Sequence, residues 1–311
     1  MNAIVGVNLA EPTANETAGL IVRAEQAGVP AYWLTIGPQD PMIIFAAAAA
    51  RTSSILLGTS IVPTFPRHPL ALAMQAIALA QLAPGRFRLG VGPSHQPTME
   101  NTWGIPFERP LAHLREYVSV LRAALTTGEV ATEGPRFRVH TRIANPPQVP
   151  IMVSALREAS FRLAGEIADG AISWVSPAAY LKRDAIPAIE AGARKAGREP
   201  PPLVAHCFIV VDEDLDAVRT IAQQRAANYP RLPFYASMFE SAGYSEARDG
   251  ILSDRMIDAI VMHGNEEQVT AGLQTFADAG ASEIIATVLP TDANREASID
   301  RAFRAIGRLA R

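Results

Sequence analysis

The chain has 311 residues, of which 49% are hydrophobic and 19% charged, and its 28 basic and 31 acidic residues give a formal net charge of −3. This composition is typical of a globular chain with enough apolar material for a sizeable core, and it excludes a disordered or fibrous protein. The basic residues form no run that would follow a phosphate backbone, so nucleic acid is not an expected partner.

The sequence also makes a membrane span and an internal disulfide unexpected. Its longest uninterrupted apolar stretch, residues 42–50, is much shorter than the roughly 20 residues that a spanning helix needs. The first residues carry no basic segment ahead of their apolar run, so we expect a cytoplasmic protein. The single cysteine, Cys207, lies inside the apolar run 204–211, which predicts a buried thiol on a strand.

Short β-branched runs alternate with segments of helical period along the chain. In the first half, strands are predicted at 3–8, 31–36, 55–61 and 86–91, each followed by a helix, at 15–27, 41–52, 68–82 and 109–126. In the second half, strands at 151–154, 170–175, 203–211 and 283–288 are followed by helices at 157–167, 178–196, 214–227 and 294–309.

Two stretches interrupt this alternation. Residues 127–150 have glycines and prolines at both ends and a period-2 middle, which predicts an excursion carrying a small hairpin. Residues 228–280 contain extra helical segments, and we expect a helical insertion at about 228–262.

Eight strand–helix units fit either a closed (β/α)₈ barrel or an open doubly wound parallel sheet, and the pattern favours the barrel without excluding the sheet. In a barrel the chemistry lies at the carboxyl ends of the strands. The residues at those ends are Asn8, Gly37, 60–63, 92–95, 154–157, 174–176, Asp212 and Pro290.

The fourth strand end, at residues 90–95, reads GVGPSH. It begins like a dinucleotide fingerprint, but it lacks the third glycine, and Pro93 removes a backbone donor. Its glycines would let a flat ring approach the backbone, although a simple turn would look the same. No GxSxG pattern surrounds Ser94, so a hydrolase triad is not expected. His95 is a candidate acid–base group, with a structural imidazole as the alternative.

Ser154 ends a predicted strand just before a helix whose first turn exposes free N–H groups, an arrangement that attracts phosphate. Ser154 acting only as a helix cap, and Arg157 only as a surface charge, are the alternatives. A dedicated metal site is not expected, because no metal-ligand spacing such as HxH or HExxH occurs among the histidines. These are His68, His95, His113, His140, His206 and His263.

A family resemblance rests on residues 55–95, which read ILLGTSIVPTFPRHPLALAMQAIALAQLAPGRFRLGVGPSH. This ordered pattern resembles the luciferase-like monooxygenase superfamily, and within it the coenzyme F420-dependent oxidoreductases. Supporting matches lie at 24–34, 109–125, 164–172 and 264–285. The resemblance implies one (β/α)₈ barrel domain spanning residues 1–311.

The resemblance also implies site residues. A non-proline cis peptide between Ser60 and Ile61 would support one face of the deazaflavin ring, residues 92–95 would approach the ring, and the backbone N–H groups of residues 154–157 would meet the cofactor phosphate. The cofactor-binding residues that we expect are Ser60, Ile61, Gly92, Pro93, Ser94, His95, Ser154, Ala155, Leu156, Arg157 and Trp174.

The implied activity is hydride transfer between C5 of the deazaflavin and a small organic substrate, with His95 or a water supplying the proton. An FMN-dependent monooxygenase, a non-catalytic flavin-binding protein and an unrelated phosphate-binding barrel isomerase are the alternatives. Arg67 or Arg157 is a candidate partner for the charged cofactor tail. A homodimer through the helices near residues 46–50 and 70–82 is expected, and helices that simply face the core are the alternative interpretation of these segments.

One departure from the family concerns residues 35–40, which read TIGPQD. Some F420-dependent sugar and alcohol dehydrogenases carry an aspartate–histidine pair here and a glutamate after the fourth strand, near the place of His95. Their substrates are therefore not transferred to this chain. Gln39 and Asp40 remain candidate polar partners of His95.

Overall fold

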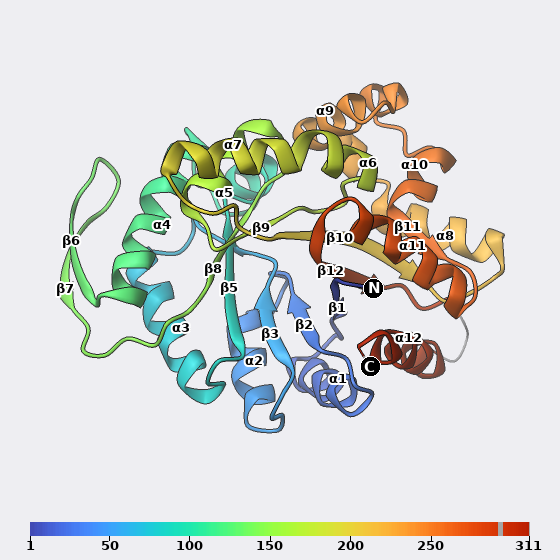
Figure 1. Cartoon of the computed structure of the whole chain (residues 1–311), viewed down its shortest axis with the longest axis horizontal. Helices are drawn as coiled ribbons and strands as arrows, with labels where there is room; N and C mark the ends of the chain where they lie inside the picture. The colour runs from blue at the N-terminus through green and yellow to red at the C-terminus, as the bar shows by residue number, and fades with distance from the viewer. Residues whose placement is uncertain (292–294, 311) are drawn as a thin grey trace.

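The computed structural model describes residues 1–291 and 295–310, and within them eight parallel strands close into a barrel (Figure 1). Each strand pairs with the next, and the last pairs with the first, where Ile4 lies opposite Glu283. The closed ring excludes the open sheet and confirms the predicted (β/α)₈ barrel. Its strands are β1 (Ile4–Asn8), β2 (Ala31–Leu34), β3 (Leu56–Thr59), β5 (Phe87–Gly92), β8 (Ile151–Ser154), β9 (Gly170–Ile172), β10 (Leu203–Val210) and β12 (Ala281–Val288).

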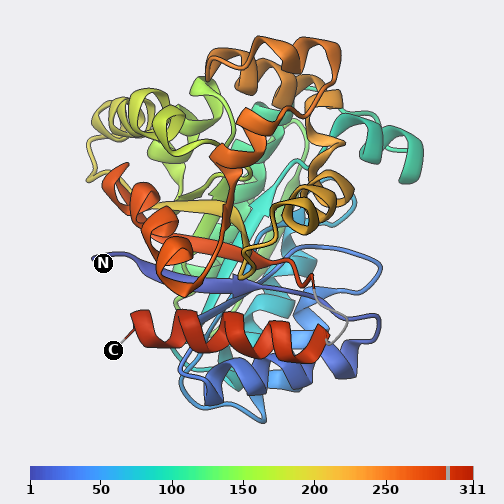
Figure 2. The ribbon, with the colours of Figure 1, turned by 90° about the vertical axis from the view of Figure 1, so that its right-hand side faces the viewer.

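Helices surround the barrel, and α12 runs beside the first strand and helix, so that the two chain ends lie on the same side (Figure 2). Arg23 of the first helix forms ion pairs with Glu296 and Asp300 of α12, which ties the two ends together. The main helices are α1 (Ala14–Gln26), α2 (Pro41–Ala49), α3 (Pro69–Leu82), α4 (Pro110–Thr126), α5 (Glu158–Ile167), α7 (Ile186–Ala196), α8 (Leu215–Ala226), α11 (Glu266–Asp278) and α12 (Arg295–Leu309).

Local sequence signals set where these helices begin. Thr13 and Glu16 form a capping box at the start of α1. Proline occupies the first turn of α2, α3 and α4, where a backbone N–H would have no acceptor within the helix. The predicted helix 178–196 forms as a continuous run of α6 (Ala178–Tyr180), the π-turn η2 (Leu181–Ala185) and α7.

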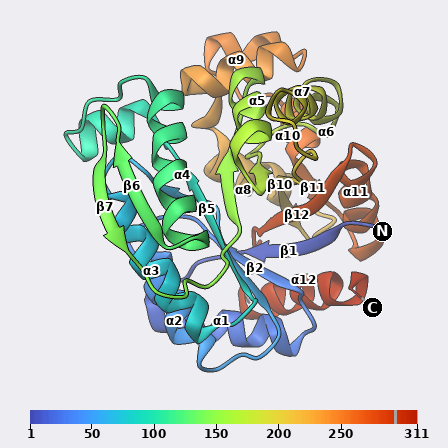
Figure 3. The same cartoon turned by 60° about the vertical axis from the view of Figure 1, so that its left-hand side comes forward.

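Two insertions extend from the barrel. The first is the predicted hairpin, formed by antiparallel strands β6 (Glu129–Glu133) and β7 (Arg138–Arg142), which lies beside α4 in Figure 3. The second follows α8 and is helical as predicted, but it ends in a strand that the sequence did not predict. Its elements are η3 (Tyr229–Arg231), α9 (Pro233–Ser241), η4 (Ser245–Asp249), α10 (Asp254–Ile260) and β11 (Val261–His263), which pairs with β10.

The third predicted strand, 55–61, is divided in two. It ends as β3 at Thr59, a cis peptide joins Ser60 to Ile61 as predicted, and β4 (Val62–Pro63) resumes the pairing with β5. At the break, the Thr59 hydroxyl accepts a hydrogen bond from the Gly90 N–H and donates one to the Gly90 carbonyl, each at 2.8 Å. A side chain thus replaces the strand ladder and satisfies the backbone groups that the break would leave unpaired.

The predicted strand 170–175 is also shorter in the structure, because β9 ends at Ile172. Val175 has a φ of 53°, a left-handed conformation that is rare for a β-branched residue and incompatible with a strand. The chain therefore turns at residues 174–175, at the mouth of the barrel.

Trp33 of β2 fills the middle of the barrel. Gly58 on the neighbouring β3 leaves room for it, since a Cβ there would collide with the indole ring. The Trp33 indole donates to Glu283 at 2.7 Å, and Glu283 also pairs with Arg88, whose guanidinium lies 4.5 Å from the Trp33 ring centroid. Cys207 is buried on β10, as predicted.

None of the helices in the described part of the chain combines the length and the apolar character that crossing a membrane requires.

Candidate active site

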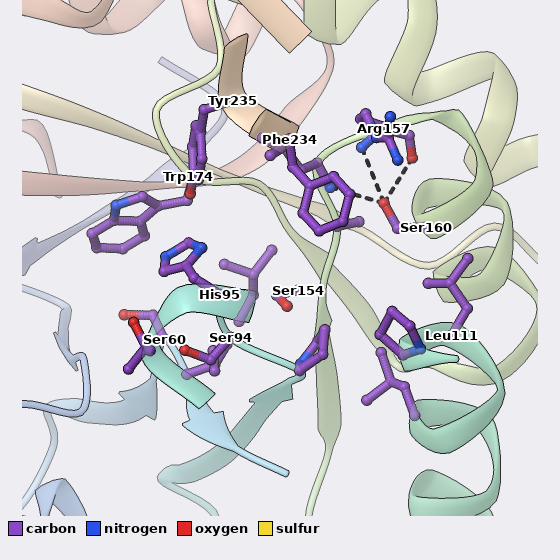
Figure 4. Close-up of a pocket in the computed structure, with 18 of the residues that line it drawn as sticks. Ser60, Ser94, His95, Leu111, Ser154, Arg157, Ser160, Trp174, Phe234 and Tyr235 are labelled. Carbon is purple, nitrogen blue, oxygen red and sulfur yellow. Dashed lines mark hydrogen bonds between the residues drawn. The ribbon is translucent and has the colours of Figure 1, made fainter. Parts of the chain in front are cut away.

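A pocket of about 480 Å³ opens at the carboxyl ends of the barrel strands. Barrel residues form its base, while α4 and the segment 229–235 of the second insertion form its outer walls (Figure 4). The lining residues are Thr35, Ile36, Ser60, Ile61, Pro93, Ser94, His95, Thr98, Phe107, Pro110, Leu111, Leu114, Ser154, Ala155, Leu156, Arg157, Ala159, Ser160, Ile172, Trp174, Tyr229, Phe234 and Tyr235.

The structure gathers the residues that the sequence predicted for cofactor binding. Ten of the eleven line the pocket, namely Ser60, Ile61, Pro93, Ser94, His95, Ser154, Ala155, Leu156, Arg157 and Trp174. Gly92 lies directly beneath them, because a Cβ on this residue would collide with the Ser154 hydroxyl. Their positions agree with the expected site, and their roles toward a ligand stay predictions.

The base of the pocket has the features of a surface for a flat polar ring. Gly92 lies beneath it, and the Ser154 side chain fills the space that a Cβ on this residue would need. Ser60 is 5% exposed, and its hydroxyl has no hydrogen-bond partner within the described residues. An unpartnered polar atom in a buried position is costly unless a ligand or water meets it. Ser60 therefore offers a hydrogen bond to whatever occupies the pocket.

His95 projects into the pocket, with Trp174 and Tyr235 on one side and Ser60 and Ser94 on the other (Figure 4). Ser94 has a φ of 63°, so the backbone turns sharply just before His95. Burial lowers the pKa of His95 below its ordinary value. The imidazole is therefore neutral at neutral pH, and it can accept one hydrogen bond and donate another.

Trp174 is fixed in the pocket wall by contacts on two sides. Its indole N–H donates to the Tyr229 hydroxyl at 2.7 Å, and its ring stacks on that of His206. The Val175 N–H donates to Nδ1 of His206 at 3.3 Å, so the ring proton lies on Nε2, which contacts the Thr287 hydroxyl at 2.8 Å. Burial holds the pKa of His206 well below its ordinary value, which keeps this ring neutral.

The opposite end of the pocket lies at the start of α5, where the sequence predicted free N–H groups for a phosphate. In the structure these groups have partners. The N–H groups of Leu156 and Arg157 both donate to the Ser160 hydroxyl at 3.0 Å, and the Ala155 N–H donates to the Ile172 carbonyl at 2.8 Å. The Ser160 hydroxyl itself donates to the Arg157 carbonyl at 2.7 Å, so an anion would have to displace this hydroxyl in order to accept from the two N–H groups.

Three residues considered as site groups lie outside the pocket, which corrects the sequence interpretation. Asp40 accepts a hydrogen bond from the Met42 N–H at 2.8 Å, capping α2, and pairs with Arg67 at 2.7 Å. Gln39 donates to the Pro12 carbonyl. The need to cap α2 fixes the carboxylate, and the carboxylate holds Arg67. Neither Gln39 nor Asp40 is therefore free to partner His95, while a role of Arg67 toward a cofactor tail outside the pocket stays a prediction.

The sequence reasoning missed the outer wall. Tyr229, Phe234 and Tyr235 reach the pocket from the second insertion, and Ser160 from α5. The segment 229–235 reads YPRLPFY, and this concentration of aromatic residues beside prolines in an irregular stretch was the available signal. Within residues 1–291 and 295–310, no group of three or more His, Cys, Asp or Glu side chains is arranged to hold a metal ion.

A barrel with a pocket at the carboxyl ends of its strands is the architecture of a class of enzymes. Comparison with known proteins identifies the family within that class. The family model described as luciferase-like monooxygenase matches residues 3–283. The chain belongs to this family, and it is an enzyme, an oxidoreductase.

Individual relatives agree with this assignment. The chain is 33% identical over 231 residues to the F420-dependent glucose-6-phosphate dehydrogenase of Nakamurella multipartita, covering 68% of this chain and 67% of that protein. It is 27% identical over 298 residues to the 5,10-methylenetetrahydromethanopterin reductase of Methanolobus tindarius, covering 89% and 90%. An F420-dependent secondary alcohol dehydrogenase, solved with an F420–acetone adduct, has the same fold, with a TM-score of 0.81, 20% identity and 97% of each chain covered.

Proposed function

We propose that this enzyme is a coenzyme F420-dependent oxidoreductase that transfers a hydride between C5 of the deazaflavin and a small organic substrate. One observation carries the proposal: a single pocket contains Ser60 and Ile61, the turn ending at His95 and the start of α5. The relatives named for F420 support this choice of cofactor.

The residues of the pocket fit such a group. The ring would lie against Ser60 and Ile61, where the unpartnered Ser60 hydroxyl offers a hydrogen bond and Gly92 leaves room for the Ser154 side chain below the pocket. The phosphate would lie at the start of α5, beside the Ser160 hydroxyl and the Arg157 guanidinium. When bound, the cofactor supplies a two-electron hydride carrier, and the protein positions the two reactants.

His95 is the catalytic group in this proposal. It lies in the pocket, and burial holds its pKa below the ordinary value. A neutral imidazole can hydrogen-bond a substrate oxygen or nitrogen, and in its protonated form it can deliver the proton that accompanies the hydride. Gln39 and Asp40, which the sequence offered as partners of His95, lie outside the pocket. His95 therefore acts with the substrate or with water.

Isotopic labelling separates this proposal from its alternatives. F420 reduced with deuterium at C5 is mixed with a panel of activated alkenes, imines and carbonyl compounds, and the products are weighed by mass spectrometry. One deuteron in the product is the expected result. An oxygen atom from O₂, gained with reduced FMN, would identify a monooxygenase. Tight cofactor binding without conversion of any panel member would identify a flavin-binding protein.

We also propose that the enzyme is a homodimer that pairs through α2 and α3. These two adjacent helices contain no charged residue, and Ile43 and Met74 on their outer faces are each 63% exposed. Ile43→Glu and Met74→Glu are expected to give monomers in sedimentation velocity. Leu215→Glu, on α8 and 56% exposed, is the matched control and leaves the dimer intact. A wild-type monomer at micromolar concentration would contradict the dimer.

A further inference from the structure

The pocket has two chemically different ends (Figure 4). Arg157 and Ser160 lie at the first end, where the guanidinium of Arg157 lies 4.8 Å from the ring centroid of Phe234. His95, Trp174 and Tyr235 lie at the second. Among the pocket-lining residues that the structure describes, Arg157 is the only one with a permanent charge.

The second end is a connected group of rings, which we call the aromatic end and define as His95, Trp174, Tyr229 and Tyr235. Tyr229 accepts the hydrogen bond from Trp174 at 2.7 Å, and its ring centroid lies 4.8 Å from that of Tyr235. The ring centroids of Tyr235 and His95 are 5.6 Å apart. Each ring of this group therefore contacts another, so together they form one continuous wall.

The aromatic end is uncharged at neutral pH. Burial raises the pKa of Tyr229 and Tyr235 and lowers the pKa of His95, so all three groups are neutral. The described lining residues include no lysine and no carboxylate. A charged ligand group placed here would lose its hydration without gaining an ionic partner.

The same rings favour one kind of ligand. Aromatic faces and edges pack best against flat apolar surfaces, which they contact over a large area. Trp174 is held by hydrogen bonding and stacking, so this surface is already formed before a ligand arrives. The N–H of the neutral His95 imidazole is available to donate one directional hydrogen bond.

We infer that the aromatic end binds the substrate, and that the substrate is an uncharged, flat, largely apolar molecule with one hydrogen-bond acceptor such as a carbonyl oxygen. Sugar phosphates and carboxylates are excluded from this end, in contrast to the substrate that names the glucose-6-phosphate dehydrogenase relative. The inference rests on the proposed function in one respect: it assigns the first end to the cofactor phosphate and the base at Ser60 and Ile61 to the ring, and it leaves the aromatic end to the substrate. His95 and Trp174, which were expected to bind the cofactor, would then contact the substrate as well.

The test compares a neutral ketone with a derivative of it that carries an added carboxylate. Binding of 4-phenylbutan-2-one and of its para-carboxylate derivative is measured by calorimetry, with and without saturating F420. The neutral ketone is expected to bind at least about 30-fold more tightly, because the pocket offers the carboxylate no ionic partner. Glucose 6-phosphate is expected not to bind. Equal or tighter binding of the carboxylate or of glucose 6-phosphate would overturn the inference.

Fluorescence locates the ligand. Trp103 is 52% exposed and Trp33 is fully buried in the barrel, so a Trp103→Phe variant reports on the pocket through Trp174. The ketone is expected to change this emission, and a Trp174→Phe variant is expected to lose the change. Ketone binding without any effect on Trp174 would show that the ligand lies elsewhere, and would refute the inference.

These two measurements need no turnover. Failure of F420 to bind would therefore refute the proposed cofactor while the ketone and carboxylate comparison still tests the aromatic end. Conversely, tight F420 binding together with equal affinity for the neutral ketone and the carboxylate would refute only the inferred substrate class.

Discussion

Trp174 lies flat on His206, with ring centroids 3.5 Å apart and ring planes inclined by 16°. His206 is fully buried, and its two nitrogens contact the backbone of Val175 and the hydroxyl of Thr287. One imidazole thus supports both the indole that forms the pocket wall and the left-handed turn that carries it.

Replacing His206 should therefore affect both stability and binding. His206→Ala removes a buried ring and leaves the Val175 N–H unpaired, so the free energy of unfolding is expected to fall by roughly 2–4 kcal/mol in urea titrations. Affinity for the neutral ketone should fall as Trp174 loses its support. His263→Ala, at a half-buried position outside the pocket, is the control and should change neither. Unchanged ketone affinity in a folded His206→Ala variant would show that Trp174 is held without it.

His113 makes folding sensitive to acid. Its ring stacks on Phe65 with centroids 4.0 Å apart, and burial lowers its pKa to about 4 from an ordinary value of 6.5. Below pH 6.5 the unfolded chain takes up a proton that the folded imidazole does not accept. The contribution of His113 is thus complete above pH 6.5, and it declines as the pH falls toward about 4.

Urea titrations on either side of this range measure the effect. The wild-type midpoint is expected to fall between about pH 7.5 and about pH 5, and to fall less in His113→Phe, which cannot titrate. His140→Phe changes an exposed histidine and should keep the wild-type dependence. An identical pH dependence in wild type and His113→Phe would contradict the assignment.

Gly92 leaves room for the Ser154 side chain at the base of the pocket. A Cβ at this position would collide with the Ser154 hydroxyl, so Gly92→Ala is expected to displace Ser154 into the pocket and weaken F420 binding by about tenfold or more. The double variant Gly92→Ala/Ser154→Gly removes the obstructing side chain and should recover most of the affinity. Fluorescence titration with F420 measures both. Full affinity in the single variant would place the ring away from this turn.

His95 is expected to control turnover and its pH dependence. His95→Gln should lower turnover of a reducible substrate by about 100-fold, while its F420 affinity stays within about threefold of wild type. If the protonated imidazole supplies the proton, the wild-type rate rises as the pH falls below 6.5 toward the lowered pKa of His95, and this rise is absent in the variant. Wild-type turnover in His95→Gln would show that water, and not His95, supplies the proton.

Much of the fold could be predicted, because hydrophobic periodicity depends on which face of each element is buried. The eight barrel strands and the helices between them follow from that pattern, and the family resemblance chose the closed barrel. The pattern could not indicate the break at Thr59 or the turn at Val175, since both depend on hydrogen bonds to distant residues, namely Gly90 and His206.

The residues of the site likewise divide into those that the sequence could predict and those that it could not. Residues at strand ends, such as Ser154 and His95, could be predicted because a barrel brings every strand end to one mouth. Tyr229 and Tyr235 could not, because their place depends on how an insertion folds back over that mouth. Asp40 was misread because its carboxylate satisfies the start of a helix, a demand that competes with any role in the pocket.

The most direct test of the central proposal is a titration of the purified protein with F420 and separately with FMN, followed by cofactor fluorescence. Binding of F420 at micromolar concentration or tighter, with negligible binding of FMN, is the predicted result. A preference for FMN would contradict the deazaflavin assignment in favour of a flavin monooxygenase, and binding of neither would contradict the hydride-transfer function itself.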